Sequence, residues 1–175
     1  MNVFFITGTS GSGKTTLTHY LKSKLPNSLF EVYDFDENGV PTNPNQTWRQ
    51  ETTDYWLTQA QKNSTQNKST VICGVTLPSE VLGSLKKISL PIYFGLIKIS
   101  DEVIQQRLKA TEWDDQLILD NIHWAHYLES EVRRQEHHMI LDSSLYETPE
   151  QTAHEFIKWI SSPTQLICSP HSLNN

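Results

Sequence analysis

Near its amino terminus the chain reads Val3-Phe4-Phe5-Ile6-Thr7-Gly8-Thr9-Ser10-Gly11-Ser12-Gly13-Lys14-Thr15-Thr16. Residues 8–15 match G-x-x-x-x-G-K-T, the pattern of a phosphate-binding P-loop. The apolar run from Val3 to Ile6 predicts a buried strand. After Lys14, apolar side chains recur at helical spacing, at Leu17, Tyr20, Leu21 and Leu25. A strand, a glycine loop and a helix in this order form the arrangement that a phosphate cradle requires.

The residue types within this loop explain how it would bind a nucleotide. Gly8, Gly11 and Gly13 permit backbone angles closed to other residues and let the chain approach a ligand closely. Backbone amides then converge on a phosphate, while Lys14 reaches the β- and γ-phosphates and the Thr15 hydroxyl binds Mg²⁺. The alternative, a glycine-rich turn that binds nothing, is disfavoured because every fixed position of the pattern is present. The predicted nucleotide-binding residues are Gly8, Thr9, Ser10, Gly11, Ser12, Gly13, Lys14, Thr15 and Thr16.

The composition of the whole chain is that of an ordinary globular protein. It has 175 residues, 37% hydrophobic and 19% charged, which predicts one domain with a full core. The net charge of −6 argues against a general nucleic-acid binder, which needs a basic face. The two cysteines form no disulfide framework, and no apolar run has the length of a membrane span. We therefore expect a cytoplasmic protein without nucleic-acid or membrane partners, with one domain over residues 1–161 and a loose tail over 162–175.

Strands alternate with helices along the chain, which is typical of an α/β protein with a parallel sheet. We expect a three-layer α/β/α arrangement around five strands, at residues 3–6, 28–35, 70–75, 92–99 and 139–141. Ligands of such sheets bind beyond the carboxyl ends of the strands. The P-loop, the pair Asp34 and Asp36, and the Cys73–Gly74 turn all fall at predicted strand ends, so we expect them to form one site.

The sequence resembles the small P-loop kinases of the nucleoside monophosphate kinase fold, and within them the shikimate and gluconate kinases, through about Ile160. Asp34-x-Asp36 after the second strand resembles the D-x-D of shikimate kinases. The segment from Leu96 to Leu108 resembles their strand-to-lid-helix segment, with Arg107 entering a short lid near residues 109–115. Gly39-Val40-Pro41, Trp48 and Trp56-Leu57 resemble gluconate kinases more faintly.

The resemblance implies a role for each of several residues. Asp36 is the candidate base that accepts the proton of the attacking hydroxyl, and Asp34 the candidate for magnesium or substrate. Arg107 is the candidate for stabilising the transferring phosphoryl group, with Arg133 and Arg134 on the later helix as alternatives. The predicted acceptor-binding residues are Asp34, Asp36, Trp48, Arg49 and Gly74. The competing interpretations are that Asp34 and Asp36 are solvated charges at a strand end, that Arg107 is a solvated helix residue, and that Trp48 packs its helix onto the domain.

Two departures from the kinase pattern bear on function. The third strand ends in Cys73-Gly74, without the aspartate that adenylate kinases carry there, so magnesium must be held otherwise, with Asp34 as the candidate. The lid is acidic, at Glu112, Asp114 and Asp115, and lacks a second arginine. These features favour a competing hypothesis, a nucleotide-binding regulatory protein with little turnover.

We therefore predict an ATP- and Mg²⁺-dependent kinase, a monomer or homodimer, that phosphorylates a hydroxyl or phosphate of a small metabolite. The acceptor would be a sugar acid, a nucleoside or a nucleotide. A GTPase is disfavoured because Asp36-Glu37-Asn38-Gly39 lies too close to the P-loop to leave a switch segment. His123 and His126 share a helical face and are a weaker candidate pair for a metal.

Overall fold

The structure, a computed structural model, describes residues 1–84 and 86–162. The predicted loose tail lies outside these residues from position 163 onward. Strands and helices alternate as the sequence predicts, in the order β1 (Val3–Thr7), α1 (Lys14–Lys24), β2 (Phe30–Asp34), α2 (Gln46–Ser64), β3 (Ser69–Cys73), α3 (Pro78–Gly83), β4 (Ile92–Lys98), α4 (Asp101–Lys109), α5 (Asp115–Arg133), β5 (His138–Asp142), the 3-10 turn η1 (Ser143–Leu145) and α6 (Pro149–Ser161).

The five strands form one parallel sheet in the order β2-β3-β1-β4-β5, which confirms the predicted fold class. The apolar strand β1 lies at the centre, with every residue buried. Val3 pairs with Thr70 of β3 on one side and with Ile92 of β4 on the other. Because all strands run the same way, the loops that follow β1, β2, β3, β4 and β5 meet at one edge of the sheet.

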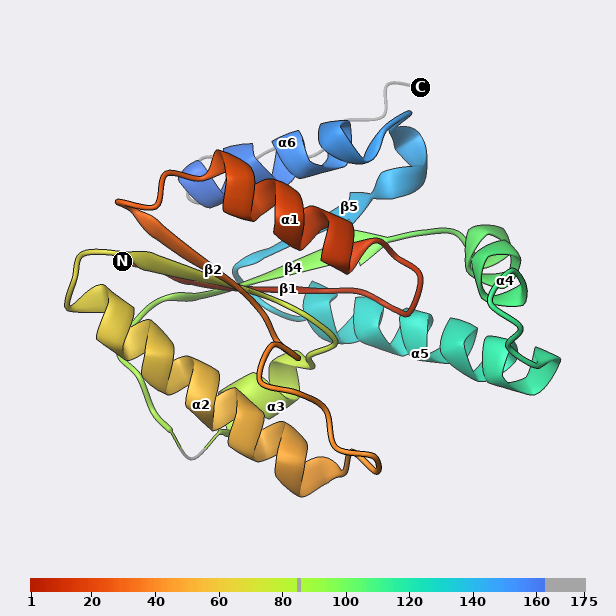
Figure 1. Ribbon diagram of the computed structural model, residues 1–175, viewed down its shortest axis with the longest axis horizontal. Helices are drawn as coiled ribbons and strands as arrows, with labels where there is room; N and C mark the ends of the chain where they lie inside the picture. Colours follow the sequence, from red (N-terminus) through yellow and green to blue (C-terminus); the bar gives the residue numbers. More distant parts are fainter. Residues whose placement is uncertain (85, 163–175) are drawn as a thin grey trace.

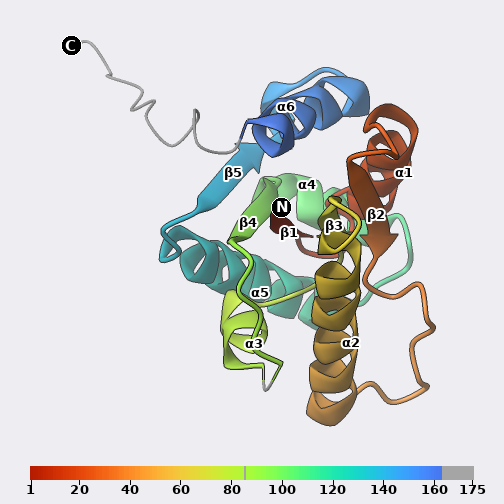
Figure 2. The same cartoon turned by 90° about the vertical axis from the view of Figure 1, so that its left-hand side faces the viewer.

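Helices cover both faces of the sheet, as Figures 1 and 2 show. On one face α1 and α6 pack over a core that includes Leu21, Phe156 and Trp159. On the other face α2, α3 and α5 pack over a second core, around Trp56 and Leu128. The structure is therefore the predicted three-layer α/β/α sandwich.

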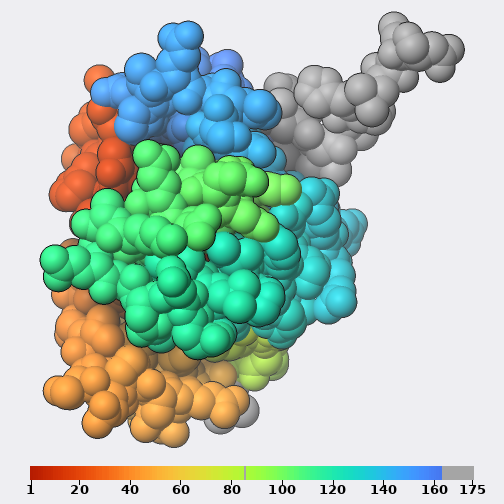
Figure 3. Space-filling view, turned by 90° about the vertical axis from the view of Figure 1, so that its right-hand side faces the viewer, coloured from red at the N-terminus to blue at the C-terminus, as the bar shows by residue number. Residues whose placement is uncertain are grey.

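Helix α4 and the amino-terminal part of α5 stand at the carboxyl edge of the sheet. Their contact is a small third core in which Ile104 and Leu108 of α4 meet Ile118 of α5. In the space-filling view they form a continuous surface between α6 and α2 (Figure 3). The short connection between them coincides with the predicted lid. No helix within the described residues is both long and apolar enough to cross a membrane.

Gly74, at the end of β3, is a site of very close packing. A methyl group at this position would place its carbon 2.2 Å from Cβ of Phe35, a side chain that is 1% exposed. The Trp56 indole N–H donates to the Phe35 carbonyl oxygen at 2.9 Å and holds this residue in place. Only glycine lets the ends of β2 and β3 approach in this way.

We expect Gly74→Ala to lower the free energy of unfolding by about 1–3 kcal/mol, the usual cost of overpacking a core. Urea denaturation measures the change. The matched control is Gly83→Ala, because nothing lies within 4 Å of the added methyl group there. A Gly74→Ala protein as stable as the control would show that Phe35 moves aside at no cost.

Candidate active site

The P-loop joins β1 to α1 in a tight ring of backbone. Gly11 and Gly13 have φ angles of 74° and 99°, in the left-handed region that favours glycine. Gly13 precedes the first residue of α1, so the free amides at the positive end of this helix face the loop. The ring is closed by the Ser12 amide, which donates to the Thr9 carbonyl oxygen at 3.2 Å. This geometry suits an anion with several oxygens.

Gly8 and Ser12 explain why the loop tolerates no side chain at its first glycine. A methyl carbon at Gly8 would lie 2.5 Å from Ser12 Oγ and 3.0 Å from the Ile97 carbonyl oxygen. Ser12 Oγ is buried and has no hydrogen-bond partner among the residues that the structure describes. A donor or acceptor on a bound ligand would satisfy it.

The Lys14 ammonium lies over the loop and donates to the Thr9 carbonyl oxygen at 2.7 Å. Burial lowers its pKa to about 8, although the carboxylates of Asp36 and Asp34 act in the opposite direction. No carboxylate within the described residues forms an ion pair with it. A partly desolvated cation without a counter-ion is suited to receive a phosphate.

Asp34 and Asp36 lie on either side of a turn that starts where β2 ends. The Asp36 amide donates to Asp34 Oδ1 at 3.0 Å, and the Glu37 amide donates to the Asp34 carbonyl oxygen at 3.1 Å. Burial and the negative charge of Asp34 raise the pKa of Asp36, while Lys14 and Arg49 lower it. A raised pKa makes the Asp36 carboxylate a better proton acceptor.

Thr15, Asp34 and Asp36 line one pocket of about 470 Å³ between α1 and the end of β2. Hydroxyl and carboxylate oxygens are the ligands that Mg²⁺ prefers, so these residues fit the predicted metal. Cys73 lies at the end of the third strand, where the kinase pattern would have an aspartate. Burial raises the pKa of its thiol to about 12, so it stays neutral and is no magnesium ligand.

Within residues 1–84 and 86–162, the protein side chains do not form a complete metal site on their own. No three side chains of the types His, Cys, Asp and Glu gather there at a point where they could hold one. His126 Nε2 instead lies 2.9 Å from Asp101 Oδ1, and His123 is exposed. Magnesium at the P-loop would therefore depend on phosphate and water ligands as well as on Thr15 and Asp34.

The lid arginine lies directly on the P-loop. Arg107 Nη1 donates to the Gly11 carbonyl oxygen at 2.6 Å. The alternatives considered from the sequence are engaged elsewhere, since Arg133 pairs with Glu129 and Arg134 with Glu131. Of the three arginines, the structure brings only Arg107 to the phosphate loop.

Sequence reasoning missed a pocket of about 330 Å³ between the P-loop and the segment that joins β5 to α6. Thr16 and Arg107 line one side of it, and the other side is formed by Ser143, Tyr146 and Thr148. The signal that could have found it was the position of this segment after the fifth strand, at the same carboxyl edge as the P-loop. The pocket has room for a nucleotide base next to the phosphate loop.

Arg49 and Trp48, at the start of α2, hold this helix against its neighbours. The Arg49 guanidinium donates to both carboxylate oxygens of Glu80, at 2.6 and 2.7 Å, and to the Val75 carbonyl oxygen at 2.9 Å. Trp48 is half-buried and packs edge-on against Phe35, with ring centres 6.2 Å apart. Both residues border the ends of β2 and β3, beside Asp36.

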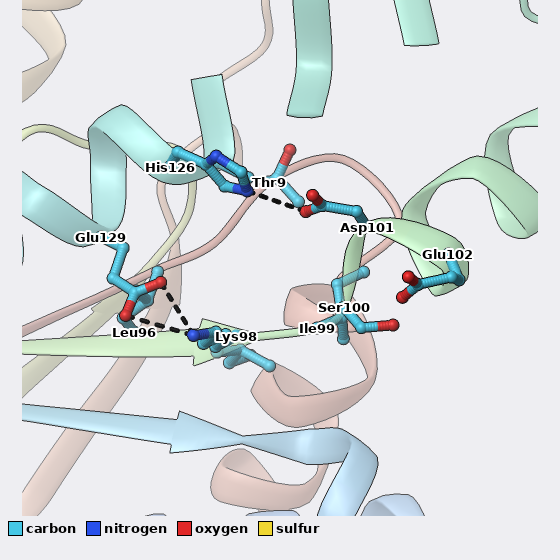
Figure 4. A pocket seen from close by; sticks show the side chains of 11 residues that line it. Thr9, Leu96, Lys98, Ile99, Ser100, Asp101, Glu102, His126 and Glu129 are labelled. Atoms are coloured by element: carbon cyan, nitrogen blue, oxygen red, sulfur yellow. Dashed lines mark hydrogen bonds and ion pairs between the residues drawn. The ribbon is translucent and has the colours of Figure 1, made fainter. Parts of the chain in front are cut away.

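Behind the P-loop lies another pocket, of about 320 Å³, drawn in Figure 4. Four of its charged side chains form two pairs: Lys98 Nζ lies 3.1 Å from Glu129 Oε2, and His126 pairs with Asp101. On its P-loop side the Thr9 hydroxyl bonds to the Asn121 side chain of α5. These contacts join the loop, β4, α4 and α5.

Comparison with known proteins supports the fold. A family described as an AAA domain (AAA_18) matches residues 5–137. No curated protein was found to match. The tunicamycin resistance protein of Deinococcus radiodurans has a TM-score of 0.65 at 16% identity, over 91% of this chain and 95% of that one. Shikimate kinase of Aquifex aeolicus has a TM-score of 0.60 at 18% sequence identity, over 93% of this chain and 98% of that one. APS kinase of Mycobacterium tuberculosis has a TM-score of 0.55 at 13% sequence identity, over 92% of this chain and 97% of that one. At these identities the likeness shows a nucleoside monophosphate kinase-like P-loop fold.

We expect Lys14→Met to stabilise the ligand-free protein at pH 7 by about 1–2 kcal/mol, since one pKa unit corresponds to about 1.4 kcal/mol and water screens part of the effect. Burial of the charged Lys14 ammonium destabilises the folded protein by its full amount below pH 8. This destabilisation disappears between pH 8 and 10.5, as Lys14 gives up its proton. The gain should therefore shrink in urea denaturation at pH 10. Lys22→Met, which removes a surface lysine paired with Glu37, is the control. An equal effect of both variants would contradict the lowered pKa of Lys14.

Proposed function

We propose that this chain, which belongs to the AAA_18 family, described as an AAA domain, is an ATP-dependent kinase. It transfers the γ-phosphoryl group of ATP to a hydroxyl or phosphate of a small metabolite, in the class of sugar acids, nucleosides and nucleotides. The observation that supports this most is the arrangement around the P-loop: Lys14 lies above it, Arg107 bonds to the Gly11 carbonyl oxygen, and the Asp36 charge acts on Lys14.

The nucleotide is proposed to lie along the carboxyl edge of the sheet. Its phosphates occupy the loop of residues 8–16, where the backbone amides and Lys14 provide the positive charge. Its base enters the pocket bounded by Arg107 and Tyr146. Thr15 and Asp34 are the candidate residues for Mg²⁺, which supplies charge neutralisation when bound with the nucleotide.

Phosphoryl transfer needs a positioned nucleophile and neutralisation of charge. The hydroxyl oxygen of the acceptor forms a bond to the γ-phosphorus, and its proton passes to the Asp36 carboxylate. The bond from the γ-phosphorus to the bridging oxygen breaks, and ADP leaves with that electron pair. Lys14 and Arg107 stabilise the charge that develops on the transferring group.

The acceptor is proposed to bind on the other side of the P-loop, between α2 and the ends of β2 and β3. Asp34, Asp36, Trp48 and Arg49 border this region, and Gly74 lies at the end of β3 within it. The close contact between Gly74 and Phe35 gives this glycine a structural reason for its presence, apart from any contact with substrate.

A second candidate function is nucleotide binding without turnover, in a regulatory protein. The observation that favours it is the neutral Cys73 thiol at the end of β3, which removes one metal ligand. The turn that presents Asp34 and Asp36 favours the kinase. A cytoplasmic location and a monomeric or homodimeric state remain predictions of the sequence.

The two candidates are separated by ADP release from ATP with and without a panel of sugars, sugar acids, nucleosides and nucleoside monophosphates. The kinase predicts release that an acceptor stimulates. Lys14→Ala should reduce it about 100-fold or more, because the transferring group loses its main fixed cation. ATP binding without stimulation would favour the regulatory protein. A correctly folded Lys14→Ala protein with unchanged turnover would remove the kinase assignment.

Asp36→Asn and Asp34→Asn test the separate roles of the two carboxylates. We expect Asp36→Asn to lower acceptor-dependent kcat by about 10²–10⁴, the usual contribution of a general base, with little change in the Kd of ATP. Asp34→Asn should instead raise the Mg²⁺ concentration required for half-maximal activity. Circular dichroism confirms that both variants fold. If both behave like the unmodified protein, the pair is a solvated strand end.

A further inference from the structure

Two positively charged side chains around the proposed acceptor region are already paired with carboxylates of the protein. The Arg49 guanidinium is neutralised by both oxygens of Glu80, which is itself held by the Leu77 amide at 3.1 Å. Lys22, the lysine that lines the pocket beside Asp34, pairs with Glu37 at 3.2 Å. Neither cation is left to balance a negative group on a substrate.

Two carboxylates of the same region have no positively charged partner among the described residues. Asp34 and Asp36 form no ion pair with any lysine, arginine or histidine in the described parts of the chain. Each raises the pKa of Lys14, and Asp34 raises the pKa of Asp36, so the two charges lie within range of each other and of the phosphate cradle. Since Asp34 is the candidate ligand of Mg²⁺, Asp36 is the carboxylate without a counter-ion that the acceptor meets next to the triphosphate.

On the lid side, several charged side chains pair with one another: Lys109 with Asp115, Arg133 with Glu129 and Arg134 with Glu131. Residues 110–132 contain no lysine or arginine, and their acidic residues are Glu112, Asp114, Asp115, Asp120, Glu129 and Glu131. Helix α5 lies on the same face of the sheet as α2 and α3, as Figure 1 shows. Residues 110–132 therefore supply no lysine or arginine that could bind an anionic acceptor from this direction.

From this distribution we infer that the acceptor is a neutral or cationic compound with a hydroxyl group, and not a carboxylate or a phosphate. The inference rests on the proposed kinase function and narrows its substrate class. An anionic group on the acceptor would be repelled by Asp36 and by the triphosphate, and the nearby cations Arg49 and Lys22 are already paired. The hydroxyl forms the new bond to phosphorus, its proton goes to Asp36, and ADP leaves.

Glu80 is the positioning residue in this scheme, because it fixes Arg49 and removes its net charge. Nη1 of Arg49 makes no hydrogen bond to the residues that the structure describes, so it remains a donor for a hydroxyl oxygen. The arginine thus provides orientation without selecting for an anion.

The test compares related acceptors of different charge: glucosamine, glucose, gluconate and glucose 6-phosphate, and adenosine against AMP. Binding is measured as the shift in melting temperature with Mg²⁺ and a non-hydrolysable ATP analogue, and turnover as ADP release from ATP. We expect the neutral or cationic members to bind at least about tenfold more tightly than their anionic partners, which corresponds to about 1.4 kcal/mol.

Preference for an anionic member, by binding or turnover, would overturn the inference and leave the kinase intact. Charge-selective binding without any ADP release would support the inference and overturn the kinase. No binding and no stimulation by any member overturns both. A second measurement uses Glu80→Gln, which frees the Arg49 charge and should shift the preference about tenfold toward the anions. Glu51→Gln, which changes an exposed side chain on α2, the helix of Arg49, should leave the preference unchanged.

Discussion

Parallel pairing of β1 with β3 on one side and β4 on the other is the constraint on which the rest of the structure depends. Because the strands share one direction, the loops after β1, β2, β3, β4 and β5 gather at one edge. The phosphate loop, the acidic turn and the lid helix thus become neighbours although they are far apart in the chain. The bond from Arg107 to the Gly11 carbonyl oxygen joins residues 96 positions apart.

Local patterns were sufficient to predict the sheet and the P-loop. Gly8, Gly13 and Lys14 stand in a short motif whose conformation depends on neighbours in sequence, and the apolar strands are short and separated by clear turns. Arg107 was found through its place after the fourth strand. Its partner could not be predicted, since the bond depends on how α4 packs against the loop.

The parts that sequence reasoning could not reach depend on contacts between distant segments. The pairing of Arg49 with Glu80 joins α2 to α3, and neither residue belongs to a motif. The pocket beside Tyr146 requires the β5–α6 connection to return to the P-loop. The roles of Asp34 and Asp36 depend on the turn at Phe35, because residues two apart on an extended strand would share one face.

The depressed basicity of Lys14 gives the site a thermodynamic property that extends beyond the P-loop. An ammonium with a pKa of about 8 is partly deprotonated in mildly alkaline solution. A phosphate anion binds the charged form preferentially, so its arrival draws a proton from the solvent. Occupancy of the loop and proton uptake are therefore linked, and the affinity for a polyphosphate falls as the solution becomes more alkaline.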